Sequence, residues 1–122
     1  MPGKVVDASV LAAVIFGEPR SAESLSLMTG ADLYAPPLLL YELANTARKK
    51  VIQYPDQADG LIKAFELAQG LEIRWVDVDH PQVVRLALDT GLTAYDASYL
   101  QVAQRLDLPL VTFDEQLRKA SA

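Results

Sequence analysis

The sequence of 122 residues contains no cysteine and only one histidine, His80. Without cysteine there are no disulfides, no thiolate metal sites and no cysteine nucleophile, and such a composition is typical of a reducing compartment. A single histidine excludes catalysis by a histidine pair. We interpret His80, in the segment Asp79-His80-Pro81, as a surface or capping residue.

Long apolar segments and nucleotide-binding motifs are missing as well. No stretch approaches the about 20 apolar residues needed to cross a bilayer, and the N-terminal residues lack the apolar core of a signal peptide. We therefore expect a cytoplasmic protein without a membrane partner. The sequence also has no G-x-x-x-x-G-K phosphate loop and no G-x-G-x-x-G fingerprint, which excludes these two nucleotide-binding classes.

The composition is that of one globular domain over residues 1–122, with 51% apolar and 22% charged residues. The net charge is −5 and the sequence pI is about 4.7. These values disfavour a protein that coats nucleic acid, because affinity for phosphates requires cationic side chains. They remain compatible with acids that hold divalent cations, since a loaded site becomes positive.

Four short apolar segments predict strands, and helical periodicity dominates between them. The predicted strands cover residues 4–6, 32–35, 72–78 and 108–113, and the predicted helices cover residues 9–16, 20–29, 36–51, 55–69, 81–90, 93–106 and 114–120. This alternation predicts an α/β fold with a central parallel sheet of four to five strands and helices on both faces. Ala22, Leu25 and Met28 mark the expected inward face of their helix.

Four acids stand in apolar surroundings. Asp7 follows the first predicted strand and Asp114 the fourth, so we expect both at the sheet edge where ligands of open α/β sheets bind. Glu42 and Asp96 interrupt apolar helical stretches. Buried carboxylates cost free energy unless they are paired or bound to metal. Oxygen ligands without a cysteine or histidine cluster indicate Mg²⁺ or Mn²⁺.

Each acid also has a purely structural interpretation. Asp7 and Asp114 are suited to cap the helices that follow them. Glu42 lies early in its helix, where a negative charge interacts favourably with the helix dipole. Thr93-Ala94-Tyr95-Asp96 matches a capping box. For any one position alone, the structural interpretation is preferred, and it is the set of four that favours a metal site.

Four short motifs in this order resemble a PIN domain. They are Val6-Asp7-Ala8-Ser9, Tyr41-Glu42-Leu43-Ala44-Asn45, Ala94-Tyr95-Asp96-Ala97 and Val111-Thr112-Phe113-Asp114. The resemblance covers nearly the whole chain. Its length and motif order are similar to the stand-alone PIN proteins that serve as VapC-type toxins of toxin–antitoxin pairs.

The resemblance implies a function and assigns residues to it. The family's acidic metal-binding positions correspond to Asp7, Glu42, Asp96 and Asp114 in this sequence. Its supporting polar positions correspond to Ser9, Asn45 and Thr112. The implied activity is a Mg²⁺- or Mn²⁺-dependent endoribonuclease that hydrolyses RNA with a metal-activated water. A homodimer or higher homo-oligomer and a cognate antitoxin are implied as well. Many relatives continue into a fifth strand, whereas this sequence ends at Ala122.

Two alternative functions compete with this one. A non-catalytic PIN-like module would bind RNA or protein, and the presence of all four acids disfavours it. A receiver-like phosphoacceptor domain needs paired acids after the first strand and a lysine after the last. Asp7 has no acidic neighbour, and no lysine directly follows residues 108–113.

Other side chains are weaker candidates for function. Basic residues that could contact RNA, or simply be solvated, are Arg48, Lys49, Lys50 and Arg85. Tyr41, Tyr95 and Tyr99 are predicted to be packing residues, from their helical spacing. We also hypothesise that an arginine or lysine of an antitoxin pairs with the acids and excludes metal.

Overall fold

The computed structural model describes residues 2–122, which form four strands and seven α-helices in alternation. The elements are β1 (Gly3–Val6), α1 (Ala8–Ile15), α2 (Ser21–Met28), β2 (Asp32–Ala35), α3 (Leu38–Gln53), η1 (Pro55–Gln57, a 3₁₀ turn), α4 (Ala58–Ala68), β3 (Ile73–Trp75), α5 (His80–Thr90), α6 (Ala94–Leu106), β4 (Leu110–Val111) and α7 (Glu115–Ser121). Every predicted strand and helix is confirmed. The strands β3 and β4 are shorter than predicted, and the predicted helix over residues 55–69 begins with the 3₁₀ turn.

All strand pairs are parallel, in the order β3-β2-β1-β4. The central strand β1 pairs Val5 with Tyr34 of β2 and Val6 with Val111 of β4. Val5 and Val6 are both fully buried, as expected for a parallel strand covered on both faces. The predicted α/β fold with a parallel sheet is therefore confirmed, with four strands within residues 2–122.

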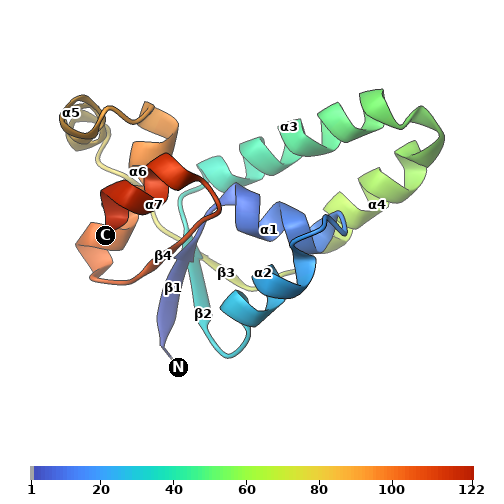
Figure 1. Cartoon of the computed structure of the whole chain (residues 1–122), viewed down its shortest axis with the longest axis horizontal. Helices are drawn as coiled ribbons and strands as arrows, with labels where there is room; N and C mark the ends of the chain where they lie inside the picture. The colour runs from blue at the N-terminus through green and yellow to red at the C-terminus, as the bar shows by residue number, and fades with distance from the viewer. Residues whose placement is uncertain (1) are drawn as a thin grey trace.

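The chain leaves β1 toward β2 and later returns to the other side of β1 as β4. Right-handed crossovers then place α1 and α6 on opposite faces of the sheet, and Figure 1 shows α1 and α2 on one side with α6 and α7 on the other. Such a reversal of strand order opens a crevice at the carboxyl ends of the two strands. In this protein Asp7 and Thr112 directly follow the carboxyl ends of these two strands, β1 and β4.

Helices α3 and α4 form an antiparallel pair that extends away from the sheet (Figure 1). Within α3, Leu39, Leu43 and Ala47 are buried at intervals of four residues, which is the spacing of one face of an α-helix. The N-terminal end of α3, whose second turn contains Glu42, adjoins the sheet, whereas the far end of the pair is exposed. Among the described residues, no helix is long and apolar enough to span a membrane.

The predicted inward face of α2 is wrong for Ala22 and Leu25, and it is confirmed for Met28, which packs against the core. Ala22 and Leu25 are exposed, and Ser24 is fully buried instead. Ser24 shares a face with Leu27 and Met28, three and four residues later, which are more buried than the rest of the helix. Met28 belongs to both possible apolar faces of this short helix, and the face that also contains Ser24 and Leu27 is turned toward the core. The Ser24 hydroxyl consequently has no hydrogen-bond partner within residues 2–122.

This buried hydroxyl predicts a stabilising substitution. Ser24→Ala should raise the free energy of unfolding by about 1 kcal/mol, because an unsatisfied buried polar group costs about 1–3 kcal/mol and alanine also favours the helix. Urea unfolding followed by circular dichroism measures the change. Ser26→Ala, at an exposed position of the same helix, is the control and should change stability by only a few tenths of a kcal/mol. A loss of stability in Ser24→Ala would contradict the prediction.

Candidate active site

Asp7 ends β1, caps α1 and is the most buried of the four predicted acids, with 5% of its surface exposed. Its Oδ1 accepts hydrogen bonds from the Ser9 hydroxyl at 2.7 Å and from the Val10 N–H at 3.3 Å. Its Oδ2 accepts a hydrogen bond from the Thr112 hydroxyl at 2.5 Å. The carboxylate is therefore both a helix cap and a junction between the two ends of the chain, and the capping interpretation is confirmed.

The hydroxyls of Ser9 and Thr112 connect Asp7 to the segment after β4. Ser9 Oγ accepts a hydrogen bond from the Phe113 N–H at 3.0 Å, and Thr112 Oγ1 accepts one from the Asp114 N–H at 3.0 Å. Each hydroxyl thus donates a hydrogen bond to Asp7 and accepts one from the backbone of the loop between β4 and α7. These paired hydrogen bonds fix the orientation of the Asp7 carboxylate relative to Asp114, although the two residues are far apart in sequence.

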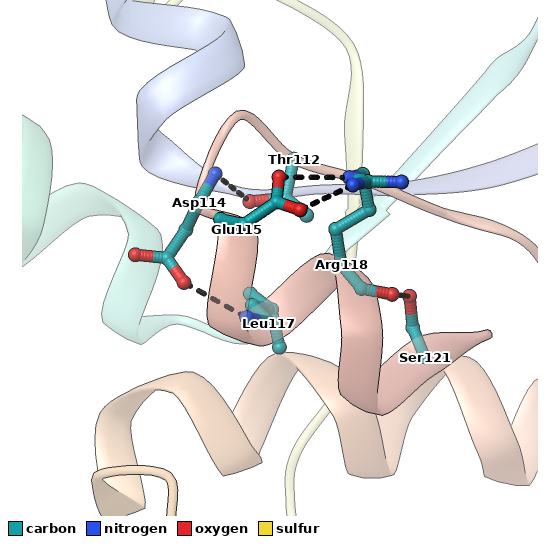
Figure 2. Close-up of polar contacts among 6 residues, drawn as sticks. All are labelled: Thr112, Asp114, Glu115, Leu117, Arg118 and Ser121. Carbon is teal, nitrogen blue, oxygen red and sulfur yellow. Dashed lines mark hydrogen bonds and ion pairs between the residues drawn. The ribbon is translucent and has the colours of Figure 1, made fainter.

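Asp114 is held by the helix that it caps. Its Oδ1 accepts a hydrogen bond from the Leu117 N–H at 2.8 Å, and Figure 2 shows this bond together with the one from the Asp114 N–H to Thr112. The next residue, Glu115, pairs with Arg118 instead of facing Asp114. Asp114 is exposed, so the expectation of an apolar setting is wrong for it. The short strand β4 ends at Val111, and the three residues that follow it bring Asp114 out to the surface.

Glu42 lies in the second turn of α3 and is partly buried. Its Oε1 accepts a hydrogen bond from the Tyr99 hydroxyl of α6 at 2.5 Å. Tyr99 is 1% exposed and packs in the core. The packing interpretation of Tyr99 is therefore confirmed, but its contact with Glu42 was missed.

Asp96 occupies the first turn of α6, where its N–H donates to the Thr93 hydroxyl at 3.1 Å. This is the Thr93 half of the predicted capping box. Capping sets the start of α6, and it leaves the partly buried Asp96 on the same helix as Tyr99 and one turn before it. The helix start thus determines where the Asp96 carboxylate lies relative to Glu42.

The acids influence one another electrostatically. Burial raises the pKa of Asp7, although hydrogen bonds from Ser9 and Thr112 partly offset the effect. Burial raises the pKa of Glu42, and the negative charges of Asp96 and Asp7 raise it further. Burial also raises the pKa of Asp96, with added contributions from the charges of Asp114 and Asp7. The structure therefore brings all four predicted acids into one electrostatically coupled group.

Among the residues that the structure describes, this group has no cationic partner. Within residues 2–122, none of the four acids forms an ion pair with lysine, arginine or histidine. In the same part of the chain, no three acidic or histidine side chains are gathered closely enough to hold a metal ion between them. The donor set nevertheless fits Mg²⁺, which is usually held by one or two carboxylates and completes its shell with water and substrate phosphate. Mn²⁺ also accepts carboxylate and water oxygens.

Several other predicted residues form no ion pair or side-chain hydrogen bond with these acids within residues 2–122. Asn45 is exposed, one turn after Glu42, and its side chain makes no hydrogen bond to residues 2–122. Lys50 is paired with Glu18 at 2.7 Å, whereas Arg48 and Lys49 are exposed on the outer half of α3. Arg85 of α5 lines a cleft of about 730 Å³ between α5 and α6. Tyr41 of α3 and Tyr95 of α6 are 75% and 63% exposed, so the packing interpretation of these two tyrosines is wrong.

One basic residue near the acids was missed. The Arg20 guanidinium lies 3.6 Å from the centroid of the Phe113 ring, and Glu23 holds it at 2.8 Å. Phe113 stands between Thr112 and Asp114, so Arg20 reaches the acidic end of the sheet from the loop before α2. A cation stacked on an aromatic ring across 93 positions has no local sequence signal.

The comparisons with known proteins agree with the fold. The PIN domain family matches residues 4–122. Ribonuclease VapC3 of Pyrobaculum aerophilum is 31% identical over 118 residues, which cover 93% of this chain and 90% of that protein. Exonuclease VapC9 of the same organism is 34% identical over 84 residues, which cover 66% of this chain and 60% of that protein.

Two crystal structures share the fold. PAE2754 from Pyrobaculum aerophilum superposes with a TM-score of 0.79 and 26% identity, covering 98% of this chain and 80% of that one. VapC20 of Mycobacterium tuberculosis, described as a toxin that cleaves the sarcin–ricin loop, superposes with a TM-score of 0.70 and 18% identity, covering 97% of this chain and 95% of that one.

The raised pKa values predict how stability depends on pH without divalent cations. Because the folded protein holds protons on Asp7, Glu42 and Asp96 more tightly than the unfolded chain does, their contribution to stability is present below the ordinary carboxyl pKa of about 4. It is lost as pH rises through the raised folded pKa values. Asp96→Asn should therefore make the melting temperature in EDTA fall less steeply above pH 4. Asp59→Asn, at an exposed position of α4, is the control, and equal slopes in both variants would contradict the prediction.

Proposed function

Because the chain belongs to the PIN-domain family, we propose that it is a metal-dependent endoribonuclease and the toxin of a toxin–antitoxin pair. The observation that carries the proposal is the group formed by Asp7, Glu42, Asp96 and Asp114, whose negative charges are mutually unfavourable and unpaired within residues 2–122. The names of the relatives, a ribonuclease and a toxin, support RNA as the substrate. We expect it to act in the cytoplasm.

One or two of the four acids would hold Mg²⁺ or Mn²⁺ together with water and substrate oxygens, and a bound ion of this kind lowers the pKa of water and stabilises charge on phosphate oxygens. Leu117 and Tyr99 donate to Asp114 Oδ1 and Glu42 Oε1, and no other residue within 2–122 donates to Asp114 Oδ2 or Glu42 Oε2. Ser9 and Thr112 hold Asp7 in place from both sides. The protein thereby supplies oriented carboxylate oxygens at one edge of the sheet, beside which an RNA phosphodiester would lie.

The RNA backbone needs a cationic contact near these acids. Arg20 is well placed for it, because its guanidinium is fixed against Phe113, the residue directly before Asp114. An arginine held in this way loses less side-chain entropy when it binds a phosphate. Of the residues proposed from sequence, Arg48 and Lys49 are exposed on the outer half of α3 and remain secondary candidates.

We propose a homodimer that forms through the apolar surface around Tyr41, Val84, Leu88 and Tyr95. These side chains are all more than half exposed, and a largely apolar pocket of about 410 Å³ lies among them, lined by Tyr41, Val84 and Tyr95. Exposed apolar patches of this kind mark protein–protein contacts. The surface adjoins the acids, since Tyr41 precedes Glu42 and Tyr95 precedes Asp96.

The antitoxin is the second expected partner. An apolar groove of about 460 Å³ between α3 and α4 is lined by Ala44, Ala47, Val51, Ile62 and Phe65. Glu42 is on the same helix as one wall of this groove. A partner segment that occupies the groove and continues along α3 would bring a basic side chain to the acids. Such an ion pair would compete with the metal ion for the same carboxylates.

Ribonuclease activity is tested with structured and single-stranded RNA in Mn²⁺, in Mg²⁺ and in EDTA. The wild type should cleave internally only with a divalent ion. Asp7→Asn and Asp96→Asn should each lower the rate by about 10²–10³-fold, the scale for losing one group that stabilises transition-state charge. Asp59→Asn is the control and should keep the wild-type rate. If the acid variants cleave as fast as the wild type, or if cleavage continues in EDTA, the activity comes from a contaminating nuclease and the protein is a non-catalytic PIN-like module.

The dimer surface is tested by placing a charge in it. Leu88→Glu should shift the protein from dimer to monomer in analytical ultracentrifugation, because a carboxylate is costly to bury in an apolar interface. Leu88 is 79% exposed in the protomer, so the substitution should leave the fold intact. Leu67→Glu is a matched control on α4, where Leu67 is 66% exposed and outside the proposed surface. If the wild type sediments as a monomer, the dimer proposal is refuted.

A further inference from the structure

Tyr99 joins the core of the protein to one of the proposed metal ligands. Its ring belongs to the buried core cluster, together with Leu100 and Val102 of the same helix. Its hydroxyl is the one polar atom of the side chain, and it donates to Glu42 Oε1 at 2.5 Å. A phenol buried in this way needs a partner, and in this protein the partner is a carboxylate oxygen of the acidic group.

The bond connects two helices that carry different acids. Glu42 is on α3 and Tyr99 is on α6, 57 positions later. Asp96 precedes Tyr99 by three residues on α6, and residues with this spacing lie on the same face of a helix. The Tyr99 hydroxyl therefore fixes Glu42 relative to the helix that presents Asp96.

The bond also decides which oxygen of Glu42 remains available. Glutamate has three side-chain torsions, and a partly buried glutamate without a partner would populate several rotamers. With Oε1 engaged by Tyr99, the carboxylate has one defined orientation, and Oε2 has no hydrogen-bond donor within residues 2–122. Asp114 follows the same pattern, since Leu117 engages Oδ1 and leaves Oδ2.

We propose that Tyr99 is a positioning residue whose hydroxyl holds Glu42 Oε1, so that Glu42 presents Oε2 alone to a divalent cation. This proposal rests on the proposed function, because it requires that the acids bind metal. Groups that orient metal ligands through hydrogen bonds commonly contribute 10–100-fold to metal affinity. In the alternative, Glu42 only provides a hydrogen-bond acceptor for the buried Tyr99 hydroxyl. Removal of the hydroxyl would then change the stability of the fold and leave the affinity for the metal ion unchanged.

The test is the affinity for Mn²⁺ itself, measured by isothermal titration calorimetry and by the electron paramagnetic resonance signal of free Mn²⁺. Tyr99→Phe keeps the buried ring and removes only the hydroxyl, so the variant should fold. We expect its dissociation constant for Mn²⁺ to be about tenfold higher or more, in line with the loss of a group that orients a metal ligand. Tyr34→Phe is the matched control, since Tyr34 is on β2, and it should bind Mn²⁺ like the wild type.

A double-mutant cycle separates positioning from a general effect on stability. Glu42→Gln removes the charged ligand but keeps a side-chain oxygen for Tyr99. If Tyr99 acts through Glu42, then Tyr99→Phe should weaken Mn²⁺ binding in the wild type and have little further effect in Glu42→Gln. An equal loss in both backgrounds would overturn the positioning role, and so would unchanged Mn²⁺ affinity in Tyr99→Phe.

The outcomes also distinguish this proposal from the proposed function. A wild type that binds Mn²⁺ and cleaves RNA, with a Tyr99→Phe variant of equal affinity, overturns the role of Tyr99 alone. A wild type that neither binds Mn²⁺ nor cleaves RNA overturns the metal site and the role of Tyr99 with it.

Discussion

The hydrogen bonds to the Asp7 carboxylate hold the rest of the site in place. Ser9 and Thr112 both donate to it, and each hydroxyl also accepts from the backbone of the loop between β4 and α7. Without the Asp7 carboxylate, the end of β1, the start of α1 and the loop that carries Asp114 would lose the hydrogen bonds that connect them. One buried charge therefore organises three segments, and its burial is tolerated because hydrogen-bond donors surround it.

The same arrangement has an energetic cost. Asp7, Glu42 and Asp96 lie within each other's electrostatic influence, and burial adds to the effect. A sequence selected for stability alone would place a basic or neutral residue at one of these positions. Active sites commonly keep such unfavourable charge and depend on the surrounding fold to maintain it. A divalent cation would relieve the repulsion, so metal binding and folding stability would be coupled.

Capping and metal binding use different parts of the same residues. Asp7 and Asp114 cap α1 and α7 through one oxygen, and Thr93 caps α6 so that Asp96 lies in its first turn. The capping interpretation is therefore confirmed for Asp7 and Asp114, and for the Thr93 half of the box that contains Asp96, whereas Glu42 lies outside the first turn of α3. Where capping is confirmed, it does not compete with the functional interpretation. Helix starts at the carboxyl edge of a parallel sheet give short polar side chains a defined orientation, which is also the requirement of a metal site.

The sequence alone determined the order of strands and helices, the parallel sheet and the expectation that Asp7 and Asp114 share one edge. These features follow from local periodicity and from the rule that parallel strands align their carboxyl ends. Only the tertiary structure decided that Tyr99 contacts Glu42 and that Asp114 is exposed. It also decided that Ser24, rather than Leu25, faces the core. A contact between residues 57 positions apart, or the rotation of a short helix, depends on how whole elements pack, and no local pattern of residues encodes it.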